Sequence, residues 1–215
     1  MQDFFSIQSG GVKTNRDDVV YDFQRDALAK RIREFIDDYN AEVDRYKRAG
    51  KPGNVDDFVR YTRVNWSRDL KQDLVRGHYA KYEDSKIVES LYRPFTKRWL
   101  FLDRMLNEEV YRIPVIFPGD EPNVVINCTT EPQIEFSAVV ANIIPCLHLG
   151  GRQGQCFPLS HLSDSARTLF RRRYDRSTLT KERIFEYIYG MLHHPGYRER
   201  YGPSVPTLMR QFSRS

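Results

Sequence analysis

Two cysteines and two histidines lie close together in the chain and have the chemistry to hold a metal ion. Cys146, His148, Cys156 and His161 fall within sixteen residues, and zinc prefers thiolate and imidazole ligands. Their spacing, C-x-H-x7-C-x4-H, matches no common zinc finger. Apolar neighbours give a second explanation, because buried thiols commonly pack in a core. We favour the core and expect no metal site; a small zinc protein remains an alternative that metal analysis would reveal.

Other reactive side chains lack the partners that catalysis requires. Glu108 and Glu109 are adjacent carboxylates, but no strand-borne Glu-x-Lys accompanies them, as a metal-dependent nuclease would need. The pair His193 and His194 falls at an expected helix end, where positive charge favours the helix dipole. The glycine-rich segment 150–154 lacks the Lys-Ser/Thr of a phosphate-binding loop, and we expect a tight turn. Base methylation also needs a glycine-rich cofactor loop and an Asn/Asp-Pro-Pro-Tyr/Phe segment, and both are missing. We therefore expect no catalytic residue and no cofactor in this chain.

Helical spacing of apolar residues dominates the first part of the chain and returns near its end. The pattern predicts helices at 26–46 and 181–192, and capping or helix-ending residues predict further helices at 67–75, 84–91 and 164–173. Asn54, Ser67 and Thr180 are expected helix caps, because their side chains can accept a hydrogen bond from the first turn. Gly77 and the pair at 195–196 are expected helix ends.

Short apolar runs in the middle of the chain predict strands. They lie at 99–102, 124–128 and 156–159, and 136–144 is ambiguous between strand and helix. Pro158 favours an edge position for the run that contains it. The predicted class is α+β, with a helical N-terminal part followed by a small mixed sheet with flanking C-terminal helices. We expect one region at 1–201 (1–90 mainly helical, 91–162 mainly strands and loops, 163–201 helical) and a disordered tail at 202–215.

The composition is that of a globular protein with unevenly distributed positive charge. The chain has 215 residues, 40% hydrophobic and 29% charged, and a net charge of +5. From Gly151 onward twelve Lys and Arg face five acids, so this part carries +7 and the first 150 residues carry −2. Such a positive field can meet phosphates, although a solvated Arg-rich helix face has the same composition.

Targeting signals are missing from the pattern. No apolar run reaches the ~20 residues of a membrane span. Residues 1–5 have no basic segment followed by an apolar stretch, so we expect no signal peptide. Three cysteines without a CxxC pair argue against a disulfide framework. We expect a cytoplasmic protein with no membrane partner.

Several phrases of the sequence, in the same order and at similar spacing, resemble the C-terminal specificity region of type ISP restriction–modification enzymes. The resemblance covers roughly residues 4–201, and its phrases are Gly11–Asp17, Val20–Phe23, Trp66–Lys71, Leu91–Leu100, Asn107–Pro114, Gly154–Leu159, Ile184–Tyr189 and Leu192–Pro195. Members of this family join a nuclease, a helicase-like ATPase, an adenine-N6 methyltransferase and a target-recognition domain in one chain. The family pattern continues past Tyr201 with further recognition-domain sequence, whereas this sequence turns to Pro203 and Pro206 and stops at Ser215, so we expect a region truncated at its C-terminus. The family pattern also has an acidic residue where Cys146 stands, which argues further against zinc.

The resemblance implies a DNA-recognition module that contributes sequence specificity to adenine methylation and restriction without catalysing either. Its expected partners are double-stranded DNA and the methyltransferase domain of the same enzyme. S-adenosylmethionine, ATP and Mg²⁺ are implied only for the other domains. The alternative is a structural remnant that packs on the methyltransferase without touching DNA, which predicts an exposed apolar patch at 111–117.

DNA recognition would use two kinds of side chain with different roles. Cations neutralise phosphates, whereas forked and amide side chains read base edges. The candidates for contact with DNA are five residues on expected loops and two in the basic last third: Lys97, Arg98, Arg152, Gln153, Gln155, Arg171 and Arg172. Each of them also fits a solvated surface. Three further residues, Lys13, Asn15 and Arg16, are expected at the contact with the methyltransferase, and Arg93 is expected to be an internal or interdomain ion-pair partner.

Overall fold

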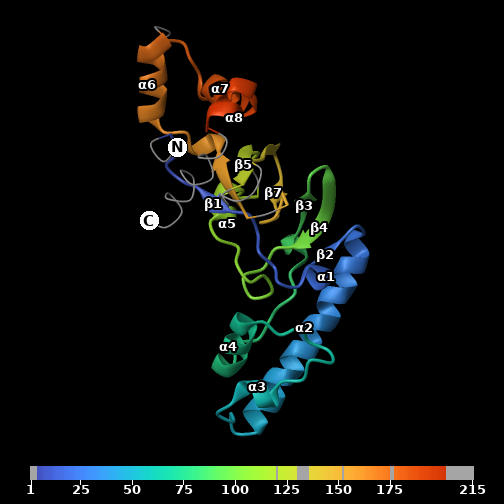
Figure 1. Cartoon of the computed structure of the whole chain (residues 1–215). Coiled ribbons are helices and arrows are strands. Elements are labelled where there is room, and N and C mark those ends of the chain that lie inside the picture. The colour runs from blue at the N-terminus through green and yellow to red at the C-terminus, as the bar shows by residue number, and fades with distance from the viewer. Residues whose placement is uncertain (1–3, 120, 130–135, 152, 175–176, 202–215) are drawn as a thin grey trace. The chain divides into compact units, whose positions relative to one another are not determined.

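The computed structural model describes residues 4–119, 121–129, 136–151, 153–174 and 177–201. The chain divides into two compact units (Figure 1). The first, which we call the sheet unit, comprises Met1–Val12, Leu91–Thr96 and Tyr111–Ser215. The second, the helical unit, comprises Lys13–Ser90 and Lys97–Val110. The predicted class, α+β with a helical N-terminal part and flanking C-terminal helices, is confirmed, and the strands form two four-stranded sheets.

One long helix organises the helical unit. Helix α2 (Arg25–Arg48) buries the predicted apolar stripe, which consists of Leu28, Ile32, Phe35, Ile36, Tyr39, Val43 and Tyr46. Helix α4 (Arg68–Arg76) contacts α2 and buries Leu70 and Leu74 completely. The short helices α1 (Asp17–Val20) and α3 (Val55–Phe58) complete the unit. Amphipathic periodicity was sufficient to predict α2 because burial of one face decides helix position, whereas α4 was predicted from Ser67 and Gly77.

The predicted helix caps are present. Asn54 accepts a hydrogen bond from the Asp56 amide, and Ser67 accepts one from the Leu70 amide. Gly77 ends α4 in the left-handed region at φ 78°, which favours glycine. The helix predicted at 84–91 is wrong. A single 3-10 turn, η1 (Asp84–Lys86), leads there into strand β3 (Ile87–Arg93), because Ile and Val fit a pleated surface that neighbouring strands complete.

A hairpin forms the centre of one sheet, whose order is β2-β4-β3-β7. Strand β2 (Tyr21–Asp22) pairs antiparallel with β4 (Thr96–Phe101), with Tyr21 opposite Leu100. The tip between β3 and β4 carries Phe95, which is 99% exposed at φ 62°. From Leu91 onward β3 belongs to the sheet unit. There the Leu91 carbonyl accepts a hydrogen bond from the backbone amide of Cys146, the residue that follows β7 (Ile144–Pro145).

The second sheet has the order β1-β8-β5-β6 and lies in the sheet unit. It consists of β1 (Ser9–Gly10), β5 (Val125–Thr129), β6 (Ala138–Ala141) and β8 (Gly154–Pro158). The expected edge position of β8 is wrong, since β1 and β5 pair with it on either side. Pro158 is tolerated because β1 covers only Gln155 and Cys156, so no neighbour needs an amide from Pro158 on that side.

Three helices follow this sheet. They are α6 (Asp164–Tyr174), α7 (Lys181–His193) and α8 (Pro195–Tyr201), and the short elements α5 (Ile113–Ile116) and η2 (Leu159–His161) precede them. One cluster joins Ile126 and Phe157 of the sheet with Phe185 and Ile188 of α7. Thr180 caps α7 as predicted. α7 ends at His193, just before the predicted end at 195–196, and Pro195 begins the further helix α8, because proline fits a first helical turn.

Two remaining expectations concern the chain's ends and membranes. The tail predicted at 202–215 lies outside the described residues. Among the residues that the structure describes, no helix combines the length and the apolar character that a membrane crossing requires.

Candidate nucleic-acid interface

Lys97 and Arg98 lie on β4, so their predicted placement on a loop is wrong. Their neighbours Trp99, Leu100 and Phe101 supply the β-forming residues that extend the strand to Thr96. Successive side chains of a strand point to opposite faces, so Lys97 and Arg98 do not lie side by side. Lys97 is exposed, whereas the Arg98 guanidinium lies 4.4 Å from the centre of the Phe23 ring.

The two glutamines lie at the start of β8. Gln153 is exposed in the turn that precedes the strand, as predicted. Gln155 lies within β8, opposite Gly10 and Cys128, so its expected loop position is wrong. The Gly154 amide, at the end of the glycine-rich segment, donates to the Leu147 carbonyl at 3.0 Å, and the expected tight turn stays a prediction. Arg152 lies outside the described residues.

Arg171 and Arg172 lie in the last turn of α6, where cations favour the helix dipole. Arg171 Nε donates to the Leu179 carbonyl at 3.1 Å, which ties the helix to the segment before α7. Arg172 is exposed. Beside them Phe170, Tyr174 and Tyr187 contact one another, and the two tyrosine hydroxyls are hydrogen-bonded at 2.8 Å. This face of the sheet unit therefore combines free positive charge with exposed aromatic rings.

Arg16 is buried inside the helical unit, with 1% of its surface exposed. Its guanidinium donates to the Leu106 carbonyl at 2.5 Å, to the Ser67 hydroxyl at 2.7 Å and to the Asn65 carbonyl at 3.2 Å. Burial lowers the pKa of this guanidinium, and the negative charge of Glu108 opposes that effect. The side chain thus joins three segments of its own unit and offers no exposed atom to another domain.

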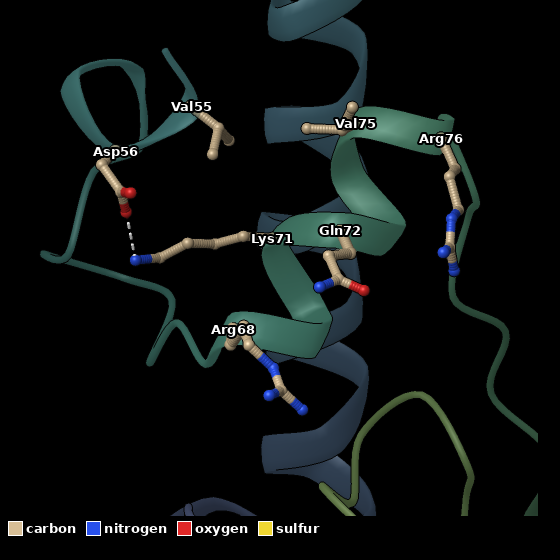
Figure 2. Close-up of a pocket in the computed structure, with 7 residues that line it drawn as sticks. All are labelled: Val55, Asp56, Arg68, Lys71, Gln72, Val75 and Arg76. Atoms are coloured by element: carbon tan, nitrogen blue, oxygen red, sulfur yellow. Dashed lines mark hydrogen bonds and ion pairs between the residues drawn. The ribbon is translucent and has the colours of Figure 1, made fainter.

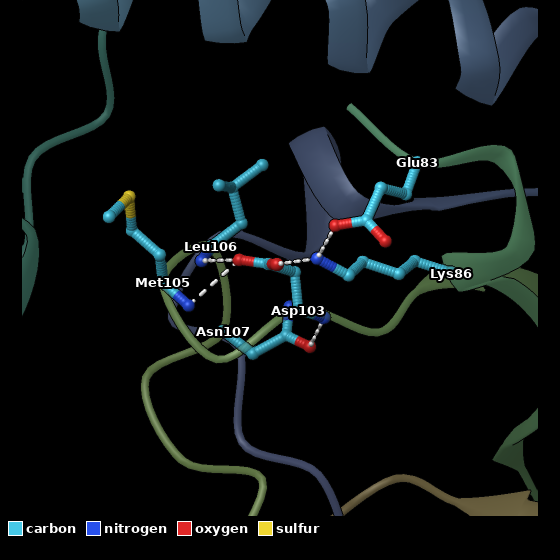
Figure 3. A network of polar contacts seen from close by, with 6 residues as sticks. All are labelled: Glu83, Lys86, Asp103, Met105, Leu106 and Asn107. Carbon is cyan, nitrogen blue, oxygen red and sulfur yellow. Dashed lines mark hydrogen bonds and ion pairs between the residues drawn. The ribbon is translucent and has the colours of Figure 1, made fainter. Parts of the chain in front are cut away.

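A polar network holds the turn that presents Leu106 to Arg16 (Figure 3). Asp103 Oδ1 accepts hydrogen bonds from the amides of Met105 and Leu106 at 2.8 and 3.1 Å. Asp103 Oδ2 pairs with Lys86 at 3.0 Å, and Lys86 also pairs with Glu83. No sequence signal pointed to this network, because its residues are brought together by the fold and by no local pattern.

The other residues expected at domain contacts differ in their surroundings. Lys13 pairs through its backbone with Glu109, and Asn15 is exposed at φ 55°. Arg93 makes hydrogen bonds within the sheet unit, and its expected role as an ion-pair partner stays a prediction. Its Nη1 donates to the Tyr92 carbonyl at 2.7 Å and to Cys146 Sγ at 3.1 Å, and its guanidinium lies over the Tyr92 ring.

Of the four metal-ligand candidates, Cys146 and His148 are joined through the His148 backbone amide, which donates to Cys146 Sγ at 3.4 Å. Cys146 accepts from Arg93, whereas Cys156 accepts from Asn127 Nδ2 at 3.3 Å. His161 is hydrogen-bonded to Ser160 at 2.8 Å. Within the described part of the chain, no three His, Cys, Asp or Glu residues gather as a metal site would require. Burial raises the pKa of the Cys156 thiol to about 12 and that of the Cys128 thiol even further, so both thiols are neutral core groups.

The segment expected to form an apolar patch is partly buried. Ile113 and Ile116 of α5 lie in the core, while Tyr111 and Val115 are exposed. The segment 111–117 therefore contributes both to the core and to the exposed apolar surface.

A sequence model of the Type ISP C-terminal specificity domain matches residues 3–207. No curated protein matches the chain significantly. Three solved structures share its fold. The DrdV–DNA complex is 31% identical, with a TM-score of 0.82 over 94% of this chain and 21% of that chain. A nuclease-deletion mutant of the Type ISP restriction–modification enzyme LlaGI, in complex with a DNA substrate mimic, is 29% identical, with a TM-score of 0.80 over 93% and 19% of the two chains.

The DNA-bound ATP-dependent Type ISP enzyme LlaBIII is 20% identical, with a TM-score of 0.77 over 94% of this chain and 14% of that one, and supports the fold alone. The chain thus spans about a fifth or less of the length of these three proteins. Because the family match covers nearly the whole sequence, this chain belongs to the Type ISP C-terminal specificity domain family.

Proposed function

We propose that this chain recognises double-stranded DNA as the specificity domain of a Type ISP restriction–modification enzyme and takes no catalytic step itself. One observation carries the proposal. Nearly the whole chain has the fold of a segment of DrdV, at 31% identity, and that protein was solved as a complex with DNA. S-adenosylmethionine, ATP and Mg²⁺ would serve the remaining domains of the enzyme.

Exposed cations support this role in each unit. Arg172 and Arg173 extend from α6 of the sheet unit, and Lys97 extends from β4 of the helical unit. Contacts of this kind give affinity and salt dependence, whereas base readout gives specificity.

Binding of fluorescent duplexes by the full chain tests the proposal. We expect a complex at about 50 mM salt that loses roughly tenfold in affinity by about 200 mM, even if only about two phosphates are neutralised. Selection from a random duplex library should enrich a defined motif. A chain that binds no duplex at the lower salt concentration would refute the proposal.

A second contact follows from the exposed tip of the β3–β4 hairpin. Phe95 is fully exposed in a conformation that non-glycine residues seldom adopt. We propose that it packs against the methyltransferase domain of the same enzyme. Phe95→Ser should weaken association with that domain and leave duplex binding by the chain unchanged; loss of duplex binding alone would contradict this assignment.

A further inference from the structure

Helix α4 has one buried face and one open face. Leu70, Asp73 and Leu74 are buried in the helical unit. On the opposite side, spaced three and four residues apart, a second set of side chains lines an open depression of about 370 Å³ that α4 shares with α3 (Figure 2). This set, which we call the α4 face, consists of Arg68, Lys71, Gln72, Val75 and Arg76.

The α4 face is held rigidly by both ends of its helix. Ser67 caps the first turn, and its hydroxyl also accepts the hydrogen bond from buried Arg16. At the other end Gly77 and His78 donate their amides to the carbonyls of Leu74 and Asp73, both at 2.9 Å. Side chains on such a preorganised helix lose little backbone freedom when they bind a ligand.

The α4 face is positively charged and partly unpaired. Its three cations and the adjacent Asp56 are the charged groups that line the depression. Lys71 pairs with Asp56 and Arg68 pairs with Asp69, both as surface ion pairs that phosphates can replace at little cost. Among the described residues, the exposed side chains of Gln72 and Arg76 have no hydrogen-bonding partner.

These side-chain types match the edges of base pairs in a major groove. An arginine fork fits guanine, a glutamine amide fits adenine, and an aliphatic group such as exposed Val75 fits the methyl group of thymine. An acidic protein surface would complement the positive charge of the α4 face, but this charge match would not involve the amide of Gln72 or the methyl groups of Val75. The combination favours duplex DNA as the occupant.

We propose that the α4 face enters the major groove of the target duplex, where Gln72 and Arg76 contact base edges while Arg68 and Lys71 bind the flanking phosphates. A helix of about 10–12 Å diameter fits this groove. The inference rests on the proposed DNA-recognition function and assigns to it a reading surface.

Variants of the full chain test the assignment. Arg76→Ala and Gln72→Ala should each lower affinity for the selected duplex by roughly 5- to 100-fold and affinity for a random duplex by no more than about threefold. Arg48→Ala, which removes another exposed arginine, at the end of α2, is the matched control. It should lower both affinities by the same small factor. Circular dichroism spectra like that of the wild type would show that the exposed substitutions leave the fold intact.

Chemical probing gives a second readout. Bound wild-type chain should protect one guanine N7 from dimethyl sulfate, and Arg76→Ala should restore its reactivity while other protected positions stay protected. If wild-type chain binds and selects a motif but both variants match the Arg48→Ala control, this inference fails and the proposed function stands. If the wild-type chain binds no duplex, both fail together.

Discussion

Replacing Arg16 by Met tests whether a buried guanidinium holds the helical unit together. The substitution keeps an unbranched apolar side chain in place but removes three charged donors, which now serve the Leu106 and Asn65 carbonyls and the Ser67 hydroxyl. Hydrogen bonds to charged groups contribute about 1.5–3 kcal/mol each, so the gross loss is on the order of 5 kcal/mol.

Part of this loss is offset because Met does not have to bury a charge, the effect that lowers the pKa of Arg16 in the folded chain. We therefore expect Arg16→Met to lower the free energy of unfolding by about 3 kcal/mol. Urea denaturation of the full chain, followed by far-UV circular dichroism, measures the change.

The matched control is Arg63→Met, which removes an arginine whose side chain is 76% exposed and pairs with Asp38. It should change stability by less than about 0.5 kcal/mol. Hydrogen exchange should show the Arg16→Met effect at the amides of α4, whose cap Ser67 loses its second partner. If Arg16→Met is as stable as the control, the three hydrogen bonds contribute nothing net and our reasoning about this site is wrong.

Three further predictions concern backbone conformation and buried thiols. Gly77→Ala should destabilise the chain by roughly 1–2 kcal/mol, since φ is +78° and the new Cβ would lie 2.9 Å from Lys47 Cε; a lower melting temperature would reveal it. Phe95→Gly should raise the melting temperature, because glycine adopts a φ of 62° without strain and no buried contact is lost. Raised pKa values of Cys128 and Cys156 keep these thiols protonated in the folded chain while the unfolded chain ionises them above about pH 9. The stability that the protonated thiols contribute is therefore fully present below pH 9 and is lost between about pH 9 and 12. Urea denaturation should give a lower free energy of unfolding at pH 10 than at pH 8. This decrease should be smaller in the Cys128→Ala/Cys156→Ala variant.

Each of these has a contrary outcome. An unchanged melting temperature for Gly77→Ala would mean that Lys47 moves away and the backbone tolerates the strain. A destabilised Phe95→Gly would show that the exposed ring has contacts of its own. Equal pH dependence with and without the two thiols would assign the alkaline loss of stability to other groups.

Local sequence patterns predicted the helices of this fold better than its sheets. α2, α4 and α7 follow from apolar spacing and from Ser67 and Thr180, because caps and amphipathic faces depend on neighbours within a few residues. The segment 84–91 was predicted as a helix, although β3 begins at Ile87; β4 follows β3 directly, but β2 and β7, which complete the sheet, come from distant parts of the chain. Pairing of that kind leaves little trace in a short stretch of sequence.

For the candidate site, the sequence predicted the types of the residues better than their positions in the fold. Arginine and glutamine were singled out as readers of DNA, but three candidates expected on loops lie in strands β4 and β8. Arg16 was expected at a domain contact, although its acceptors lie 49 to 90 residues away in sequence and bury it. The sequence did not predict the α4 face as a binding surface, because charged helix faces are common in soluble proteins. This one differs from them only in its capped helix ends and in the open depression that it lines.

The division of the chain has a consequence for engineering new specificities. The helical unit is an insertion: its two segments, Lys13–Ser90 and Lys97–Val110, are separated by Leu91–Thr96, which belongs to the sheet unit. A chimera that takes residues 13–110 from a relative therefore has two options for the hairpin tip, Leu91–Thr96. It either includes the donor's tip or keeps the recipient's six residues between two strands of the donor. Breakpoints just before Lys13 and just after Val110 keep β2, β3 and β4 from one parent, whereas swaps that cut within β3 or β4 would mix two parents in one strand.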